Sequence, residues 1–326
     1  MHSLNDNLNE VIAPAQRAMA LKTDIRPRLV AISAAFAAIA AGDATDGLFD
    51  LSSLREAPVD DDFLDCLPDL QGTSMHIDNP RGACIIFAAC DPTYLTKYAV
   101  PLVWSLERLA RPVTLHLHLY NPTVEATAIF AGLEKKLRHV MLRRSEEMVN
   151  LDEYCSGPVY FSCARFCRAY QLLRANDLPV VAVDVDVLFR KPVSQLPGLL
   201  ASHVDIGVKG QVNSPPWERV SGQCVIYQQT ERSREYARLV ASLVARNFES
   251  KKGLWFLDQI CLYLAICAMK DRLRIDWDRN RISCDTRLGE NAVMWTVTVQ
   301  KHLDDPFNRF ASSLVAEFTA APEVAY

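Results

Sequence analysis

The pattern of apolar and polar positions changes near residue 80, after which short apolar runs alternate with helical periodicity. The runs at 83–88 and 179–183 are continuous, as in strands buried on both faces, whereas the run at 113–119 alternates. Further elements are predicted as helices at 94–109, 124–136, 163–174 (capped by Ser162) and 231–248, and as a short strand at 140–142. This order predicts an α/β fold with a mixed, mostly parallel sheet flanked by helices, which binds its ligands at the carboxyl ends of the strands.

Residues 1–80 have a different character. Helical composition at 11–19 and 29–40 is followed by an acidic, turn-rich stretch at 57–80, which predicts a helical N-terminal appendage and a linker. The apolar run at 29–41 is about 13 residues long, fewer than the roughly 18–20 that span a bilayer. It also begins too deep in the chain, behind several acidic residues, for a signal peptide. We therefore expect no transmembrane segment and a cytoplasmic location.

The charge argues against nucleic-acid binding, and the glycine content argues against the glycine-rich motifs that bind nucleotides. The 35 Lys and Arg against 39 Asp and Glu give a net charge of −4 with no long basic run, so we expect no nucleic-acid partner. The 12 glycines form no GxGxxG pattern, and the one GxxxxG pair, Gly42 and Gly47, lacks the continuation of a P-loop. If the protein binds a nucleotide, some other group must offset the charge of the phosphates.

The cysteines and two of the histidines are predicted to be structural. The ten cysteines form no CxxC pair and lie in apolar or helical stretches, which indicates reduced core residues. Cys163 and Cys167 share a helix face, and packing is favoured there over a metal or redox role because no His or paired Cys stands nearby. His116 and His118 are predicted to lie on the less buried face of their strand rather than to bind metal.

Two carboxylates mark the end of the strand at 179–183. In extended chain, Asp184 and Asp186 would point to the same side, while the valines between and beside them pack. Two buried ionised carboxylates are costly unless a cation compensates them, and a hard divalent cation such as Mg²⁺ or Mn²⁺ takes oxygen ligands and bridges to phosphates. The alternative is that the two acids end the strand and cap neighbouring backbone.

Short motifs follow one another in a fixed order between residues 83 and 310. They are IIFAACDPTY at 85–94, Ser105-Leu106, Arg165-Phe166, VVAVDVD at 180–186, FRKPVSQL at 189–196, SGQCVIY at 221–227, WFLDQ at 255–259, and MWT at 294–296 with Lys301 behind it. In this order they resemble the GT-A-fold glycosyltransferases of the glycogenin and lipopolysaccharide galactosyltransferase kind. The resemblance implies a GT-A domain at 81–326.

The resemblance also implies a reaction and a set of site residues. Such enzymes move a hexose from a UDP-sugar to an acceptor with Mn²⁺ (or Mg²⁺) and retain the anomeric configuration; the acceptor here, a glycan, a protein or a small molecule, is not indicated. The implied metal ligands are Asp184 and Asp186. The implied donor-binding residues are Asp91, Tyr94, Arg165, Asp184, Gly222, Trp295 and Lys301, and the implied catalytic residues are Asp258, Gln259 and Arg165.

The sequence departs from this family at the third metal ligand. Many members carry His-x-x-Gly-x-x-Lys, in which the histidine binds the metal. Here Lys301 is present, but Trp295 stands at the matching place of the histidine and the glycine is missing. His302 is adjacent to the lysine and is an alternative, so the third ligand stays open.

Two other functions fit parts of the sequence. Residues 180–188 also resemble the opening motif of haloacid dehalogenase-like phosphatases, in which Asp184 would be the nucleophile and Asp186 the general acid and base, with Mg²⁺. About 180 residues precede the motif, however, and no later acidic pair follows a glycine. The second alternative is a helical scaffold joined to an inactive transferase-like domain, which the presence of both aspartates weighs against.

Overall fold

The computed structural model describes most of the chain beyond residue 50. The described residues are 50, 52–55, 58, 60–71, 74–154, 156–201, 203–210, 219–252, 256–278, 281–297 and 305–324. The helices expected at 11–19 and 29–40 lie outside these residues, so the N-terminal appendage stays a prediction. No helix in the described ranges is long and apolar enough to cross a membrane.

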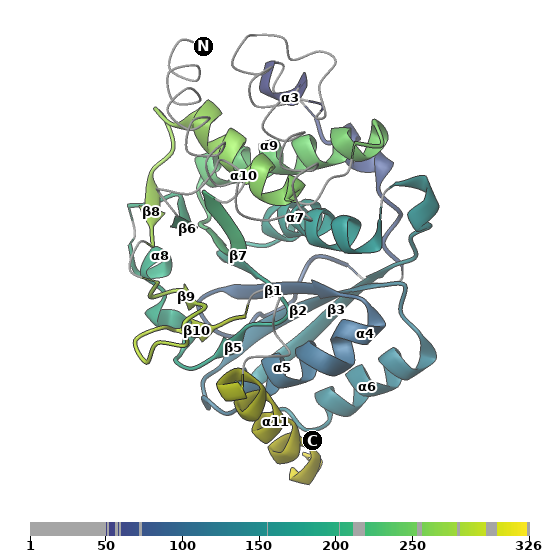
Figure 1. The fold of residues 1–326 in the computed structure, drawn as a ribbon, viewed down its shortest axis with the longest axis vertical. Helices are drawn as coiled ribbons and strands as arrows, with labels where there is room; N and C mark the ends of the chain where they lie inside the picture. The colour runs from purple at the N-terminus through teal and green to yellow at the C-terminus, as the bar shows by residue number, and fades with distance from the viewer. Residues whose placement is uncertain are drawn as a thin grey trace, which may run out of the picture.

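A seven-stranded sheet forms the centre of the molecule (Figure 1). Its strands, in spatial order, are β3 (Val140–Glu147), β2 (Val113–Tyr120), β1 (Ile85–Cys90), β4 (Val180–Val183), β7 (Val220–Tyr227), β6 (Ile206–Gly210) and β8 (Ile275–Trp277). The first four are parallel, β7 is antiparallel to both β4 and β6, and β6 is parallel to β8. A second sheet joins β5 (Leu188–Phe189), β10 (Met294–Trp295) and β9 (Cys284–Asp285). The predicted mixed, mostly parallel sheet is confirmed.

Helices cover both faces of the large sheet (Figure 1). On one side lie α7 (Gly157–Ala175), α9 (Glu231–Glu249) and α10 (Leu257–Met269). On the other lie α4 (Pro92–Tyr94), the π-helical turn η3 (Leu95–Ala99), α5 (Val100–Glu107), α6 (Val124–Glu134) and the C-terminal α11 (Asp305–Ala320). The remaining short elements are α3 (Ser52–Arg55), η2 (Asp62–Cys66), η4 (Leu151–Glu153), η5 (Val193–Gln195) and α8 (Pro197–Leu200).

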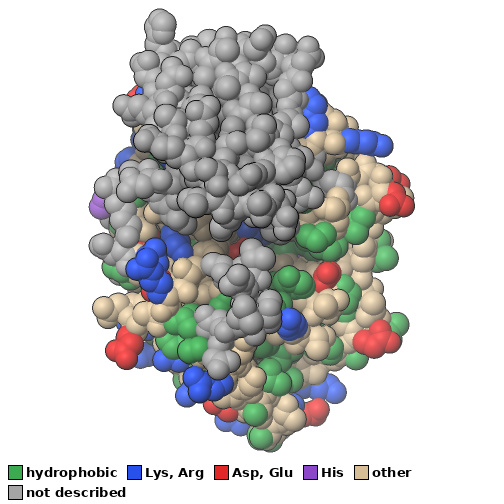
Figure 2. Space-filling model, viewed as in Figure 1, with side chains coloured by type: hydrophobic (Ala, Val, Ile, Leu, Met, Phe, Trp, Pro, Cys, Tyr) green, Lys and Arg blue, Asp and Glu red, His purple; other side chains and the backbone are tan. Residues whose placement is uncertain are grey.

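The continuous apolar run of β1 contributes side chains to two hydrophobic cores, one on each face of the sheet. Ile85 and Phe87 pack under α7, α9 and α10, whereas Ile86 and Ala88 belong to the core on the α5 side. All four of these side chains are buried because side chains alternate along a strand and helices cover each side. Figure 2 shows that acidic and basic side chains are interspersed over the described part of the visible face, in keeping with the small net charge.

The expectations for two histidines, one helix and one strand need correction. His116 and His118 are completely buried rather than on a less buried face, because α7 covers that side of β2. The helix predicted at 163–174 begins earlier, at Gly157, and Ser162 is no cap: its hydroxyl donates to Val159 O at 3.0 Å inside the helix. Strand β3 extends to Glu147, beyond the predicted 142, because it pairs with β2 along its whole length.

The packing role of the cysteines is confirmed where the structure describes them. The nine described cysteines are free thiols, and seven of them are buried. The thiol of Cys167 donates to Ala241 O at 3.4 Å, and burial raises its pKa well above the usual value. Such a thiol is an inert core group.

Candidate functional site

Arg165, in the middle of α7, is the centre of a buried polar cluster. Its guanidinium pairs with Asp184 and lies 3.3 Å from Asp258 Oδ2. It also donates to two backbone oxygens, Ser162 O at 2.9 Å and Gly222 O at 3.0 Å. The cluster therefore joins α7, the end of β4, β7 and the start of α10, four elements that are far apart in the sequence.

The local fold explains why these side chains meet. Strand β4 ends at Val183, and Asp184 stays tied to β7 through its N–H, which donates to Gln223 O at 3.1 Å. Asp258 lies in the first turn of α10, where the helix dipole favours an acid. Phe256, just before that turn, has a φ of 72°, a left-handed conformation that is strained for a residue with a Cβ.

Gly222 leaves room for the Arg165 side chain beside the backbone of β7. A Cβ at this position would lie 2.8 Å from one Arg165 guanidinium nitrogen and 3.0 Å from Asp258 Oδ2. Any larger residue would therefore displace either the arginine or the aspartate. Glycine is required here by close approach of side chains to the backbone of β7.

The cluster carries two carboxylates against one guanidinium. Burial raises the pKa of Asp258, and the charge of Arg165 offsets only part of that effect. Burial alone would lower the pKa of Arg165, but Asp184 and Asp258 raise it above its usual value, so the guanidinium stays charged. The Asp184 side chain is 30% exposed, against 8% for Arg165. The site can thus present a partly solvated carboxylate oxygen to a cation.

Asp184 and Asp186 do not lie in extended chain as expected. The backbone turns here, and the N–H of Val187 donates to Asp184 O at 3.3 Å. Asp184 faces Arg165, while Asp186, only 4% exposed, lines a neighbouring cavity. Across the described residues there is no group of three or more His, Cys, Asp or Glu side chains arranged to hold a metal ion. Metal binding by the two aspartates stays a prediction.

The cavity beside Asp186 has a volume of about 420 Å³. It lies between the start of α5, the turn after β4 and the C-terminal helix α11. The described residues that line it are Lys97, Tyr98, Pro101, Asp186, Leu188, Phe307, Asn308, Ala311, Ser312 and Val315. Its position next to the strand-end acids makes it the natural place for a ligand in a fold of this kind.

The loop after β1 holds the next two predicted residues. The Asp91 carboxylate caps α4 by accepting from the Tyr94 N–H at 2.7 Å. The ring of Tyr94 lies 4.9 Å from the ring of Tyr98, which lines the cavity. Burial raises the pKa of Tyr94, and the charges of Asp91 and Asp184 add to this. Tyr94 is exposed, so its ring is open to a ligand.

The other predicted residues are less closely associated with Arg165. Gln259 is half-buried and follows Asp258 in α10. Trp295 lies on β10, where its ring is 4.1 Å from the Arg190 guanidinium and its indole N–H donates to Gly289 O at 3.0 Å. Lys301 and His302 lie outside the described residues. The structure thus gathers Arg165, Asp184, Gly222 and Asp258, and places Trp295 in the small sheet.

Two lysines near the site belong to none of the family motifs. Lys97 lines the cavity, and Lys209 on β6 is buried, with its ammonium donating to Gln223 Oε1 at 2.9 Å. Lys209 interrupts the apolar strand IGVKG, which is the one signal that could have drawn attention to it. Nothing in the residues around Lys97 separates it from an ordinary surface lysine.

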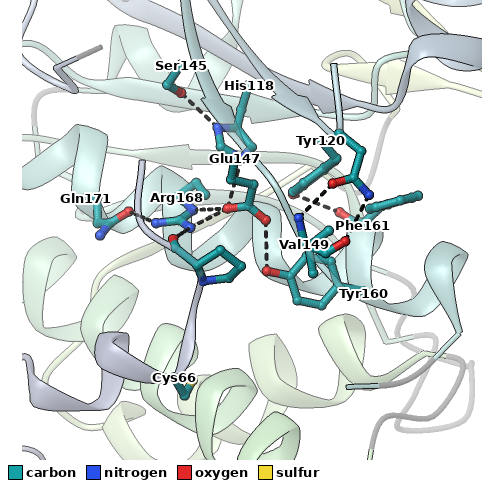
Figure 3. Close-up of polar contacts among 12 residues, drawn as sticks. Cys66, His118, Tyr120, Ser145, Glu147, Val149, Tyr160, Phe161, Arg168 and Gln171 are labelled. Carbon is teal, nitrogen blue, oxygen red and sulfur yellow. Dashed lines mark hydrogen bonds and ion pairs between the residues drawn. The ribbon is translucent and has the colours of Figure 1, made fainter. Parts of the chain in front are cut away.

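A second buried polar network surrounds Glu147 (Figure 3). Arg168, one turn after Arg165 on α7, donates to Glu147 Oε2 at 2.7 Å. Tyr160 donates its hydroxyl to the other oxygen of Glu147 at 2.8 Å, and His118 Nε2 lies 3.2 Å from Oε2. Burial alone would raise the pKa of Glu147, but His118, Arg168 and Tyr160 hold it below its usual value. This network ties α7 to β2 and β3.

Comparisons with known proteins bear on the fold. No protein-family model matches the chain, and no curated protein matches its sequence. Among solved structures, the bifunctional glycosyltransferase WbbM in its apo form is similar over 76% of this chain and 51% of that chain, with 13% identity and a TM-score of 0.51. The chain thus spans about half the length of WbbM.

Two further solved structures are similar at lower scores. The galactosyltransferase LgtC, in complex with donor and acceptor sugar analogs, shows 13% identity over 74% of this chain and 97% of that chain, with a TM-score of 0.49. The glycosyltransferase GlyE of Streptococcus pneumoniae shows 12% identity over 75% and 67%, with a TM-score of 0.47. The sheet topology and the similarity to WbbM show that this chain has the Rossmann-like GT-A fold of glycosyltransferases.

Proposed function

We propose that the protein is a metal-dependent glycosyltransferase that moves a hexose from a UDP-sugar to an acceptor, with retention of the anomeric configuration. The observation that carries the proposal is the Arg165 cluster, in which two carboxylates, one directly after β4 and one from α10, share one guanidinium at the carboxyl end of the parallel strands. The GT-A fold supports it.

The residues at the strand end suit a hard divalent cation. Asp184 and Asp186 supply carboxylate oxygens, one partly exposed and one lining the cavity, which leaves room for phosphate and water oxygens. A cation bound there would act as a Lewis acid toward the diphosphate leaving group. With two acids in the cluster and one arginine, the charge balance favours such a cation.

The chain's own residues position the donor. Arg165 holds Asp184 and Asp258 in fixed orientations, so that little reorganisation is needed when charge develops on the sugar. Asp258 and Gln259, at the start of α10, would contact the sugar near its anomeric carbon. Asp91 and Tyr94 would lie beside the nucleoside, and Lys301 and Trp295 would close over the diphosphate.

The deciding experiment is a panel of UDP-sugars assayed for UDP release with Mn²⁺, with Mg²⁺ and with a chelator. We expect release with at least one sugar, and its loss on chelation. A protein that neither binds UDP with Mn²⁺ nor releases it from any sugar would be a scaffold. Hydrolysis of phosphomonoesters with an acyl phosphate on Asp184 would instead establish the phosphatase alternative.

A further inference from the structure

The helix after β1 contains a π-helical turn where the sequence predicted a continuous helix. This turn, η3, covers Leu95–Ala99 between α4 and α5. π-Helical turns are rare and occur frequently at functional sites, because the extra residue in the turn changes the direction of its side chains. Here Lys97 and Tyr98 of the turn line the cavity that Asp186 also lines.

Lys97 is the one basic side chain among the described residues of this cavity. Its ammonium lies 5.1 Å from the centre of the Tyr98 ring. The tyrosine ring therefore supports the ammonium without neutralising its charge. The nearby Arg165, by contrast, is occupied by two carboxylates.

The other wall of the cavity is formed by the C-terminal helix. Asn308 and Ser312 lie one turn apart on α11, with the small Ala311 between them. This wall combines polar groups with apolar surface, as expected for an organic ligand that carries one charged group. The Asp186 carboxylate alone would repel an anion, but a cation at the strand end and Lys97 together would attract a phosphate.

We propose that Lys97 binds a phosphate of the nucleotide donor in the cavity between η3 and α11. This inference rests on the proposed function and adds a residue that the motifs did not indicate. It also gives the π turn a role: it directs a lysine into the cavity next to the acids. Lys97 would then be a donor-binding residue that distinguishes nucleotides from nucleosides.

The test is equilibrium binding of UDP, UMP and uridine to the full chain by calorimetry, with Mn²⁺ present. Lys97→Gln should weaken UDP binding about 10-fold, the usual size of one lost charge-assisted hydrogen bond, and leave uridine binding within about 2-fold. Lys97→Arg should retain most of the affinity for UDP. Lys270→Gln, at an exposed lysine after α10, is the matched control and should bind all three ligands as the wild type does.

The outcomes separate this inference from the proposed function. Equal UDP affinity of Lys97→Gln and wild type would overturn the role of Lys97 and leave the proposed function intact. An equal loss of UDP and uridine binding would also overturn it, because the effect would not be specific to phosphate. Failure of the wild type to bind UDP at all would overturn the proposed function, and this inference with it.

Discussion

Two arginines one turn apart on α7 belong to clusters of opposite character. The Arg168 cluster is closed: Glu147 is completely buried, accepts from Tyr160 and Arg168 of α7, and lies 3.2 Å from His118 Nε2 of β2. The Arg165 cluster is open on one side, because Asp184 remains partly exposed and lies next to the cavity of Asp186. The same pairing of guanidinium and carboxylate thus occurs once without access for a ligand and once with it.

This difference indicates that the Arg168 cluster stabilises the fold, whereas the Arg165 cluster is accessible to a ligand. A buried charge pair with every atom bonded has nothing left to offer a substrate, and breaking it leaves an uncompensated charge. An incompletely satisfied pair with excess negative charge can accept a cation. Mutations in the two clusters should therefore differ in their effects on activity and on stability.

The largest effect is expected from substitutions at the strand-end acids of the open site, and it should fall on activity and not on stability. Asp184→Ala and Asp186→Ala should each reduce Mn²⁺-dependent turnover more than about 1,000-fold, because each would remove a proposed ligand of the ion that is expected to stabilise the leaving group. The melting temperature of the metal-free protein should stay nearly unchanged, since Arg165 keeps Asp258 and two carbonyls as partners. UDP release and thermal melting measure the two quantities.

Asp177→Ala, at an exposed acid just before β4, is the control for these variants and should leave both quantities unchanged. A large fall in the melting temperature of either site variant would mean that the strand-end acids are structural. The division between the two clusters would then be wrong.

Mutation of the closed cluster should lower the stability of the fold. Glu147→Gln leaves the buried Arg168 without a counter-charge, and loss of one partner of a buried pair costs about 3–5 kcal/mol of unfolding free energy. Arg246→Gln, which breaks an exposed pair with Glu249 on α9, should cost less than about 1 kcal/mol. Urea unfolding compares the two variants. Equal stability of Glu147→Gln and wild type would show that the network contributes little.

Gly222→Ala should lower activity with a smaller change in stability. The added methyl would lie 2.8 Å from Arg165 and 3.0 Å from Asp258, so one of the two must move. A displacement of about 1 Å at a reacting centre reduces turnover by roughly 100-fold. Gly132→Ala on α6, where a Cβ would meet nothing within 4 Å, is the matched control. Full activity of Gly222→Ala would mean that Arg165 is not positioned for the reaction.

The sequence predicts the sheet better than the site. Strands β1, β2 and β4 follow from apolar runs, because hydrophobic periodicity is a local property of the chain. The contacts of Arg165 join residues up to 93 positions apart, and only the order of family motifs indicated them. The turn at Asp184 and the π turn at Lys97 depend on tertiary packing, so no local pattern revealed them.

The smallest effect is a difference in pH dependence between the two clusters. The pKa of Glu147 is lowered on folding, so its stabilisation is present above the usual pKa of Glu, about 4.3, and is lost as pH falls through the lower folded value. The pKa of Asp258 is raised, so ionising it destabilises the fold as pH rises from the usual value of about 3.9 through the higher folded value. Asp258→Asn should therefore gain stability over wild type as pH rises, whereas Glu147→Gln should lose it. Urea unfolding at several pH values measures both; the same sign for both variants would remove the distinction between an open and a closed cluster.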